Sequence, residues 1–140
     1  MKRTRLLLVN PAHSVSYWGF EYSVRLLGKR YSNAPLSLIT IAAMCPDDWD
    51  VTVADENVEP IDLDTPCDLV GITAMNVQAA RAFELAAAFR RRGRKVVIGG
   101  PFATIQPERC QPHFDVVFVG EAERTWPAFC SQLARGSHLR

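Results

Sequence analysis

Five short apolar runs occur along the chain, and each one stops at small polar or turn-forming residues. The runs span residues 5–10, 51–54, 68–73, 95–99 and 115–119. An apolar run of about five residues between turn residues is typical of a strand buried on both faces. Because longer segments separate the runs, we expect five parallel strands joined by right-handed crossovers.

The clearest helix is predicted for residues 77–92, which combine a polar side with an apolar side. Its apolar stripe consists of Ala79, Ala82, Phe83, Ala86 and Phe89. Prolines interrupt residues 56–67 and 101–114. We therefore expect at most one helical turn in the first of these segments and only short helices in the second.

Two further helices are predicted near the ends of the domain. The earlier one covers residues 35–45, because Pro35 suits a first helical position and Pro46 cannot continue a helix. Its predicted apolar face consists of Leu36, Ile39 and Ala43, with Leu38 and Ala42 beside it. The later one covers residues 125–135, with Thr125 as a favourable capping residue.

The strand order 2-1-3-4-5 is the flavodoxin-like, or Rossmann-like, solution for a doubly wound α/β sheet of five parallel strands. Ligands of such sheets bind outside the carboxyl ends of the strands, where the strand order reverses. Ten residues at these ends are the candidate binding residues: Asn10, Thr73, Ala74, Met75, Gly99, Gly100, Pro101, Phe102, Gly120 and Glu121. Taken alone, the pair Gly99-Gly100 is as consistent with a simple turn as with a close ligand.

The bulk properties favour one soluble domain. A chain of 140 residues suits a single domain, which we expect over residues 1–136, with a linker or tail over 137–140. The 16 Lys and Arg residues nearly balance the 15 Asp and Glu residues, so the charge does not favour a nucleic-acid partner. The apolar stretches are too short for a membrane span or a signal peptide. Membrane association is not indicated, and a cytoplasmic location is expected.

Several well-known chemical motifs are missing from the sequence. It contains no Gly-x4-Gly-Lys-Ser/Thr phosphate loop, and no Gly-x-Gly-x-x-Gly fingerprint follows the first strand. The four cysteines, Cys45, Cys67, Cys110 and Cys130, form no Cys-x-x-Cys pair. We expect them to be buried thiols rather than part of a metal or disulfide site. No catalytic residue and no metal ligand is assigned.

Five motifs in register across residues 31–134 resemble the cobalamin-binding domain at the N-terminus of radical S-adenosylmethionine enzymes. They are Ala34-Pro35-Leu36-Ser37-Leu38, Val53-Ala54-Asp55-Glu56-Asn57-Val58, Asp68-Leu69-Val70-Gly71-Ile72-Thr73, Val97-Ile98-Gly99-Gly100-Pro101 and Val119-Gly120-Glu121-Ala122-Glu123. The aromatic loop Tyr17-Trp18-Gly19-Phe20-Glu21-Tyr22 resembles the subgroup that includes hopanoid methylases.

The resemblance implies how a cofactor would bind. The corrin ring of cobalamin would lie over the carboxyl edge of the sheet, and its nucleotide tail would enter the crevice. The small residues at the candidate positions would admit that bulk, and the Thr73 hydroxyl and backbone amides would bond to the tail. Many such domains carry Asp-x-His-x-x-Gly after the first strand to ligate cobalt. Here Asn10-Pro11-Ala12-His13 departs from that pattern, so His13 is not assigned as a ligand.

The resemblance also implies a longer enzyme. S-adenosylmethionine and an iron–sulfur cluster would belong to a radical S-adenosylmethionine domain in cis, because this chain lacks the Cys-x3-Cys-x2-Cys cluster motif. The chain would then be the non-catalytic, cofactor-binding part. The implied reaction is methyl transfer to an unactivated carbon of a small-molecule or lipid-like substrate.

Two other interpretations stay open. A flavodoxin-like domain without a cofactor would serve as a docking or interaction domain, which the aromatic residues between positions 17 and 31 favour. The same aromatic residues are equally consistent with covering the sheet. A flavin bound to the same topology is the third possibility.

Overall fold

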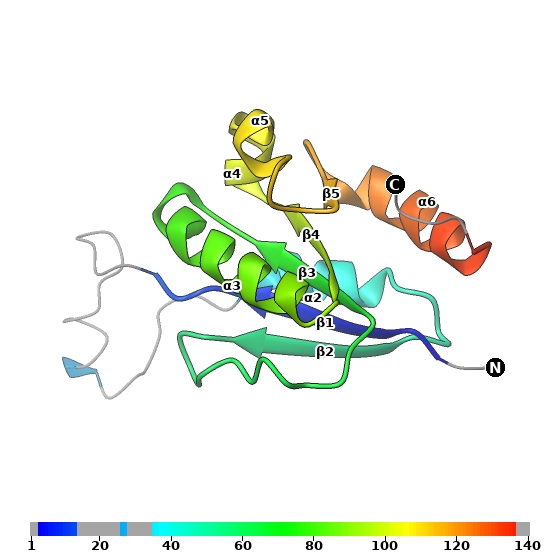
Figure 1. Ribbon diagram of the computed structural model, residues 1–140, viewed down its shortest axis with the longest axis horizontal. Helices are drawn as coiled ribbons and strands as arrows, with labels where there is room; N and C mark the ends of the chain where they lie inside the picture. Colours follow the sequence, from blue (N-terminus) through cyan, green and yellow to red (C-terminus); the bar gives the residue numbers. More distant parts are fainter. Residues whose placement is uncertain (1–2, 14–25, 28–34, 137–140) are drawn as a thin grey trace.

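The computed structural model describes residues 3–13, 26–27 and 35–136. Its centre is a five-stranded sheet in the order β2-β1-β3-β4-β5, with every neighbouring pair parallel (Figure 1). The strands are β1 (Arg5–Asn10), β2 (Asp50–Asp55), β3 (Leu69–Thr73), β4 (Lys95–Gly99) and β5 (Val116–Val117). The flavodoxin-like strand order predicted from the sequence is therefore confirmed.

Helices cover both faces of the sheet. They are α2 (Leu36–Ala43), α3 (Ala79–Arg91), α4 (Pro101–Ile105), α5 (Pro107–Cys110) and α6 (Ala122–Ala134), with the 3-10 turn η2 (Asn76–Gln78) leading into α3. As predicted, the segment between β2 and β3 carries no helix, and the segment after β4 forms only the short α4 and α5. The predicted aromatic loop over residues 17–22 lies outside the described residues.

Successive side chains of a strand point to opposite faces of the sheet, and this produces two apolar cores, one on each face. Side chains such as Val9, Val70 and Ile98 pack with α3 and α4 in the first core. Leu8 and Val97 point to the opposite face and pack with residues of α2 and α6 in the second core. Burial on both faces explains why these strands are almost continuously apolar in sequence.

Two boundary predictions are wrong. The fifth strand is limited to Val116–Val117 instead of residues 115–119, although the N–H groups of Asp115 and Phe118 still bond to carbonyls of β4. The last helix begins at Ala122 rather than at Thr125, and no side chain caps it. Thr125 is followed two residues later by Pro127, a spacing typical of a helix start, but the chain has already entered the helix there.

The predicted centre of the apolar face of α2 is also wrong, because the flanking residues Leu38 and Ala42 are the ones that pack. Leu38 is the buried residue of this helix, whereas Leu36 is 71% and Ile39 is 50% exposed. The sequence Leu-Ser-Leu-Ile-Thr-Ile-Ala-Ala is apolar on most sides, so helical spacing alone does not distinguish the side that packs.

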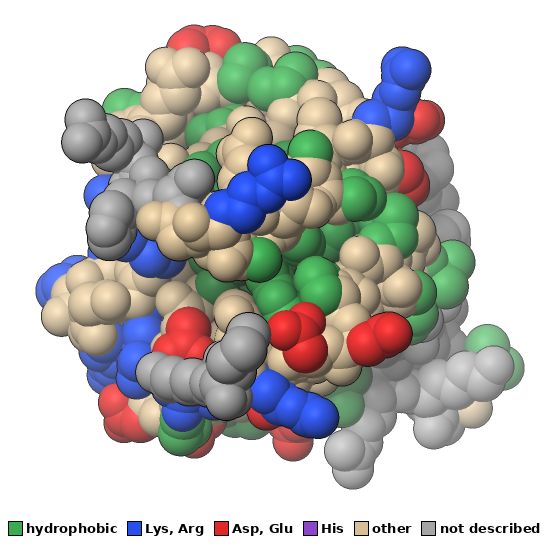
Figure 2. All heavy atoms as spheres, turned by 90° about the vertical axis from the view of Figure 1, so that its right-hand side faces the viewer, with side chains coloured by type: hydrophobic (Ala, Val, Ile, Leu, Met, Phe, Trp, Pro, Cys, Tyr) green, Lys and Arg blue, Asp and Glu red, His purple; other side chains and the backbone are tan. Residues whose placement is uncertain are grey.

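The amino edge of the sheet is held by ion pairs. The Arg5 guanidinium donates two hydrogen bonds to the Asp68 carboxylate, at 3.0 and 3.1 Å. Lys95 and Arg90 lie within 4 Å of Asp115. Figure 2 faces this side of the molecule and shows basic and acidic side chains interspersed rather than gathered into a patch of one sign. No helix among the described residues is long and apolar enough to cross a membrane.

Candidate functional site

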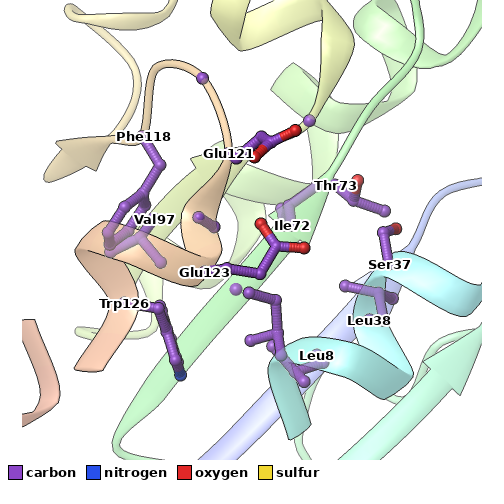
Figure 3. Close-up of a pocket in the computed structure, with 16 residues that line it drawn as sticks. Leu8, Ser37, Leu38, Ile72, Thr73, Val97, Phe118, Glu121, Glu123 and Trp126 are labelled. Atoms are coloured by element: carbon purple, nitrogen blue, oxygen red, sulfur yellow. The ribbon is translucent and has the colours of Figure 1, made fainter. Parts of the chain in front are cut away.

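A cavity of about 190 Å³ opens between α2, α6 and the carboxyl half of the sheet (Figure 3). Its floor is a row of three residues on adjacent strands, Leu8, Gly71 and Val97, which the sheet register places side by side. All three face the side of the sheet that α2 and α6 cover, because their neighbours in sequence point to the other core.

Gly71 gives the Leu8 side chain room to lie across the floor of the cavity. A Cβ atom added to this residue would lie 2.8 Å from Leu8 Cδ2 and 3.8 Å from Val97 Cγ2. Gly71 is not among the glycines with positive φ, so its backbone does not require glycine. A strand glycine of this kind is typical of a place where a ligand or another backbone comes close.

Two helices form the walls. Leu38 and Ile41 project from α2, and Trp126 projects from the second turn of α6. The Trp126 ring is 2% exposed and packs against Phe118, Phe129 and Trp49, with ring centroids 5.5, 5.3 and 6.5 Å away. This aromatic cluster fixes one wall of the cavity, since large rings packed at these distances have little room to change rotamer.

The mouth of the cavity lies at the carboxyl edge of the strands. Five of the predicted residues line it: Thr73, Gly99, Gly100, Gly120 and Glu121. Gly100 has φ +95°, and a Cβ there would lie 2.7 Å from Thr73 Oγ1, so this position requires glycine for both conformation and space. Gly99 differs, because a Cβ there would meet only Phe118 Cβ at 3.7 Å.

The polar groups of the cavity are found at this mouth. Ser37, Glu121 and Glu123 are exposed, and Thr73 is half-buried. In Figure 3 the Glu123 carboxylate points from α6 across the opening toward α2. Within the described part of the chain, neither Glu121 nor Glu123 forms an ion pair or a side-chain hydrogen bond. Their carboxylates are therefore available to accept hydrogen bonds from a bound molecule.

The family model for the B12 binding domain matches residues 30–130, which is more than half of the chain. This chain belongs to the B12-binding domain family. Its sequence is 33% identical over 136 residues to an uncharacterized methyltransferase of Synechocystis, covering 94% of this chain and 25% of that protein. It is 34% identical over 100 residues to the bacteriochlorophyllide d C-8(2)-methyltransferase of Chlorobaculum tepidum, covering 71% and 22%.

A third relative is the hopanoid C-2 methylase of Rhodopseudomonas palustris, 30% identical over 120 residues, with 84% of this chain and 23% of that protein covered. The chain thus spans about a quarter of the length of the curated relatives that it matches. The family resemblance expected from the five motifs is confirmed.

The other five predicted residues lie outside the cavity of this B12-binding domain. Ala74 and Phe102 are buried in the opposite core, where the Ala74 carbonyl accepts a hydrogen bond from the Phe102 N–H at 3.0 Å. Met75 and Pro101 are exposed beside them and do not line the cavity. Asn10 is buried below the edge, where its side chain bonds to Asp55 and to Gln78.

Gln78 organises the loop that follows β1. Its Nε2 donates to Asn10 Oδ1 and to the Pro11 carbonyl, both at 2.8 Å, and its Oε1 accepts a hydrogen bond from the Met75 N–H at 2.9 Å. Its Nε2 also lies 3.5 Å from His13 Nε2. In this B12-binding domain, Asn10 and His13 therefore belong to a polar network beside the cavity.

Glu56 holds the same loop from the side of β2. Its carboxylate accepts a hydrogen bond from the Ala12 N–H at 2.8 Å and three from Arg81, the shortest at 2.6 Å. Burial opposes the charge on Glu56, but the bonds from Arg81 and Ala12 outweigh it and keep the pKa of Glu56 below its usual value. The polar run Asp55-Glu56-Asn57 at the end of β2 is the sequence signal for this network.

The sequence prediction missed most of the walls and floor of the cavity. Gly71 was readable as a glycine inside an apolar strand, which is the usual mark of close approach. Leu38 and Trp126 carried no such signal, because each reads equally well as an ordinary core residue of an amphipathic helix. Glu123 lay within the resemblance motif but was not assigned a role.

Proposed function

We propose that this chain is the cobalamin-binding module of a larger methyltransferase and that the cavity receives the nucleotide tail of the cofactor. The observation that carries the proposal is the cavity of about 190 Å³ that lies over the sheet and opens at the carboxyl ends of the strands. Membership of the B12-binding domain family supports the choice of ligand.

The residues present suit such a cofactor. Leu8, Val97 and Trp126 offer apolar surface for a buried ring, and Gly99, Gly100 and Gly120 leave the carboxyl edge open to a large corrin. The Thr73 hydroxyl and the carboxylates of Glu121 and Glu123 at the mouth can accept hydrogen bonds from the ribose hydroxyls of the tail. When bound, cobalamin supplies methyl transfer, and the chain positions and shields it.

We further propose that the whole protein is a radical S-adenosylmethionine enzyme, with that domain and its iron–sulfur cluster in cis. The lengths of the relatives and their names as methyltransferases or methylase support this. Two of those names specify a bacteriochlorophyllide and a hopanoid. They favour a small-molecule or lipid-like methyl acceptor.

The test is a titration of the purified chain with hydroxocobalamin, followed by equilibrium dialysis and visible absorbance. Gly99→Val is the informative variant, because its side chain would enter the cavity while making only an ordinary contact with Phe118. We expect binding to weaken by roughly tenfold or more, the equivalent of about 1.4 kcal/mol. Ala87→Val, on the exposed side of α3, is the matched control and should bind like the natural sequence.

Failure of the natural chain to retain hydroxocobalamin at high micromolar concentrations would contradict the proposal. That result would favour a docking domain without a cofactor. Equal binding by Gly99→Val would mean that the cofactor lies elsewhere on the chain.

A further inference from the structure

We infer that the cavity selects corrinoids whose lower base is an apolar benzimidazole over those whose lower base is a purine such as adenine. The inference rests on the proposed function. It concerns which member of the corrinoid class the chain accepts, and it follows from how polar and apolar groups are distributed over the lining.

The deep part of the cavity presents mainly hydrocarbon to a bound ring. Its buried lining consists of Leu8, Leu38, Gly71, Ile72, Val97, Phe118 and Trp126. The main-chain groups of the floor are engaged in the ladders between β1, β3 and β4. The indole N–H of Trp126 is buried and has no hydrogen-bond partner among the described residues, but in Figure 3 it points away from the cavity. A base seated here exchanges water for hydrocarbon on most of its surface.

The polar side chains of the lining are restricted to the mouth. Ser37, Glu121 and Glu123 are exposed, so they remain hydrated and lie where the tail would leave the cavity. They suit the hydroxyl groups of a ribose, which donate hydrogen bonds, better than they suit the edge of a deeply buried base. The lining thus divides a nucleotide tail into an apolar inner part and a polar outer part.

The size of the cavity agrees with a fused ring. An apolar cavity of about 150 Å³ holds benzene, and this one measures about 190 Å³ and is open at one end. Dimethylbenzimidazole presents to such walls a six-membered carbon ring that carries two methyl groups. Adenine presents ring nitrogens and an amino group, which would lose water without gaining partners. A buried unpaired polar group of this kind weakens binding roughly ten- to hundredfold.

Equilibrium dialysis of the full chain against three corrinoids tests the inference: cobalamin, its adenine-containing analogue and cobinamide, which lacks the nucleotide tail. We expect cobalamin to bind at least roughly tenfold more tightly than either of the other two. Equal binding of cobalamin and the adenine analogue would overturn the inference and leave the proposed function intact. Equal binding of cobalamin and cobinamide would show that no tail occupies the cavity, which also overturns it. Retention of none of the three would contradict the proposed function itself.

A pair of variants on α2 locates the selectivity. Ile41 lines the cavity and Ile39, two residues earlier, is exposed on the outside of the helix. Ile41→Gln should narrow the preference for cobalamin over the adenine analogue by roughly threefold or more, since the amide can pair with a purine edge. Ile39→Gln should leave that ratio unchanged. Val97→Thr, which places a hydroxyl on the floor at nearly constant volume, replaces Ile41→Gln if that variant does not fold. An unchanged ratio in the cavity variant would overturn the inference.

Discussion

The side-chain amide of Gln78 donates a hydrogen bond to Asn10 Oδ1 at 2.8 Å, although 68 positions separate the two residues. Gln78 is only 2% exposed, and both ends of its amide are engaged. The contact ties the start of α3 to the end of β1. It accounts for a polar side chain buried beside two apolar cores.

Replacing Gln78 by Leu should therefore destabilise the fold. The variant leaves Asn10 Oδ1 and the Met75 N–H without their partners, so we expect the free energy of unfolding to fall by about 1–3 kcal/mol. Urea unfolding followed by circular dichroism measures the change. Gln132→Leu, at an exposed position of α6, is the matched control and should change stability by less than about 0.5 kcal/mol. Similar effects of the two substitutions would contradict the structural role of Gln78.

The ion pair between Glu56 and Arg81 predicts a pH-dependent part of the stability. The pKa of Glu56 is lower in the folded chain than its value of 4.5 in the absence of structure. The contribution is therefore complete above that value and is lost as the pH falls through the lower, folded pKa. We expect Glu56→Gln to lose about 1–3 kcal/mol at pH 7 and to show a flatter stability curve below pH 5, about where Glu begins to take up protons.

Glu84 provides the control for this experiment, because its carboxylate bonds to the same Arg81 at 2.8 Å but is 65% exposed. Glu84→Gln should cost no more than about 0.5 kcal/mol. Urea unfolding of both variants from pH 3 to pH 8 makes the comparison. If the free energy of unfolding of Glu56→Gln fell with pH as steeply as that of the natural sequence, the Glu56 carboxylate would not be the cause of the pH dependence.

The contact between Gly71 and Leu8 predicts a non-additive pair of substitutions. Gly71→Ala places a Cβ 2.8 Å from Leu8 Cδ2, so we expect a loss of about 1–3 kcal/mol. In a Leu8→Ala background the colliding methyl group is gone, and the same glycine substitution should be close to neutral. The double-mutant cycle should yield a coupling of about 1 kcal/mol or more. Additive losses would indicate that Gly71 is required for another reason.

The four thiols should react slowly in the folded chain. Burial raises the pKa of all four, and for Cys130 to about 12. The thiolate is the reactive form, so modification by Ellman's reagent at pH 8 should be much slower than in 6 M urea. We expect Cys45 to react first, since it is half-buried while the other three are buried. A thiol that reacted at once in the native chain would contradict this arrangement.

The central strands β1, β3 and β4 could be predicted because they are buried on both faces and so appear as continuous apolar runs. The mouth of the cavity could be predicted because parallel strands end at one edge, which brings Thr73, Gly99 and Gly120 together. The side of α2 that packs against the sheet could not be predicted, because the helix is apolar on nearly all sides. Only the tertiary fold places Leu38 in the core. Gln78 was missed for a different reason: its partners lie more than sixty residues away, beyond any local pattern.

The cavity between α2, α6 and the sheet stays open in the folded chain, so a bound molecule would complete the packing of this face. A molecule that enters the cavity makes contacts that only the folded chain offers. Its binding and the folding of the chain are therefore linked equilibria. Heat resistance should then rise steadily with the concentration of a genuine occupant. The melting temperature of this domain, measured with and without a candidate ligand, therefore reports whether that ligand binds the folded chain.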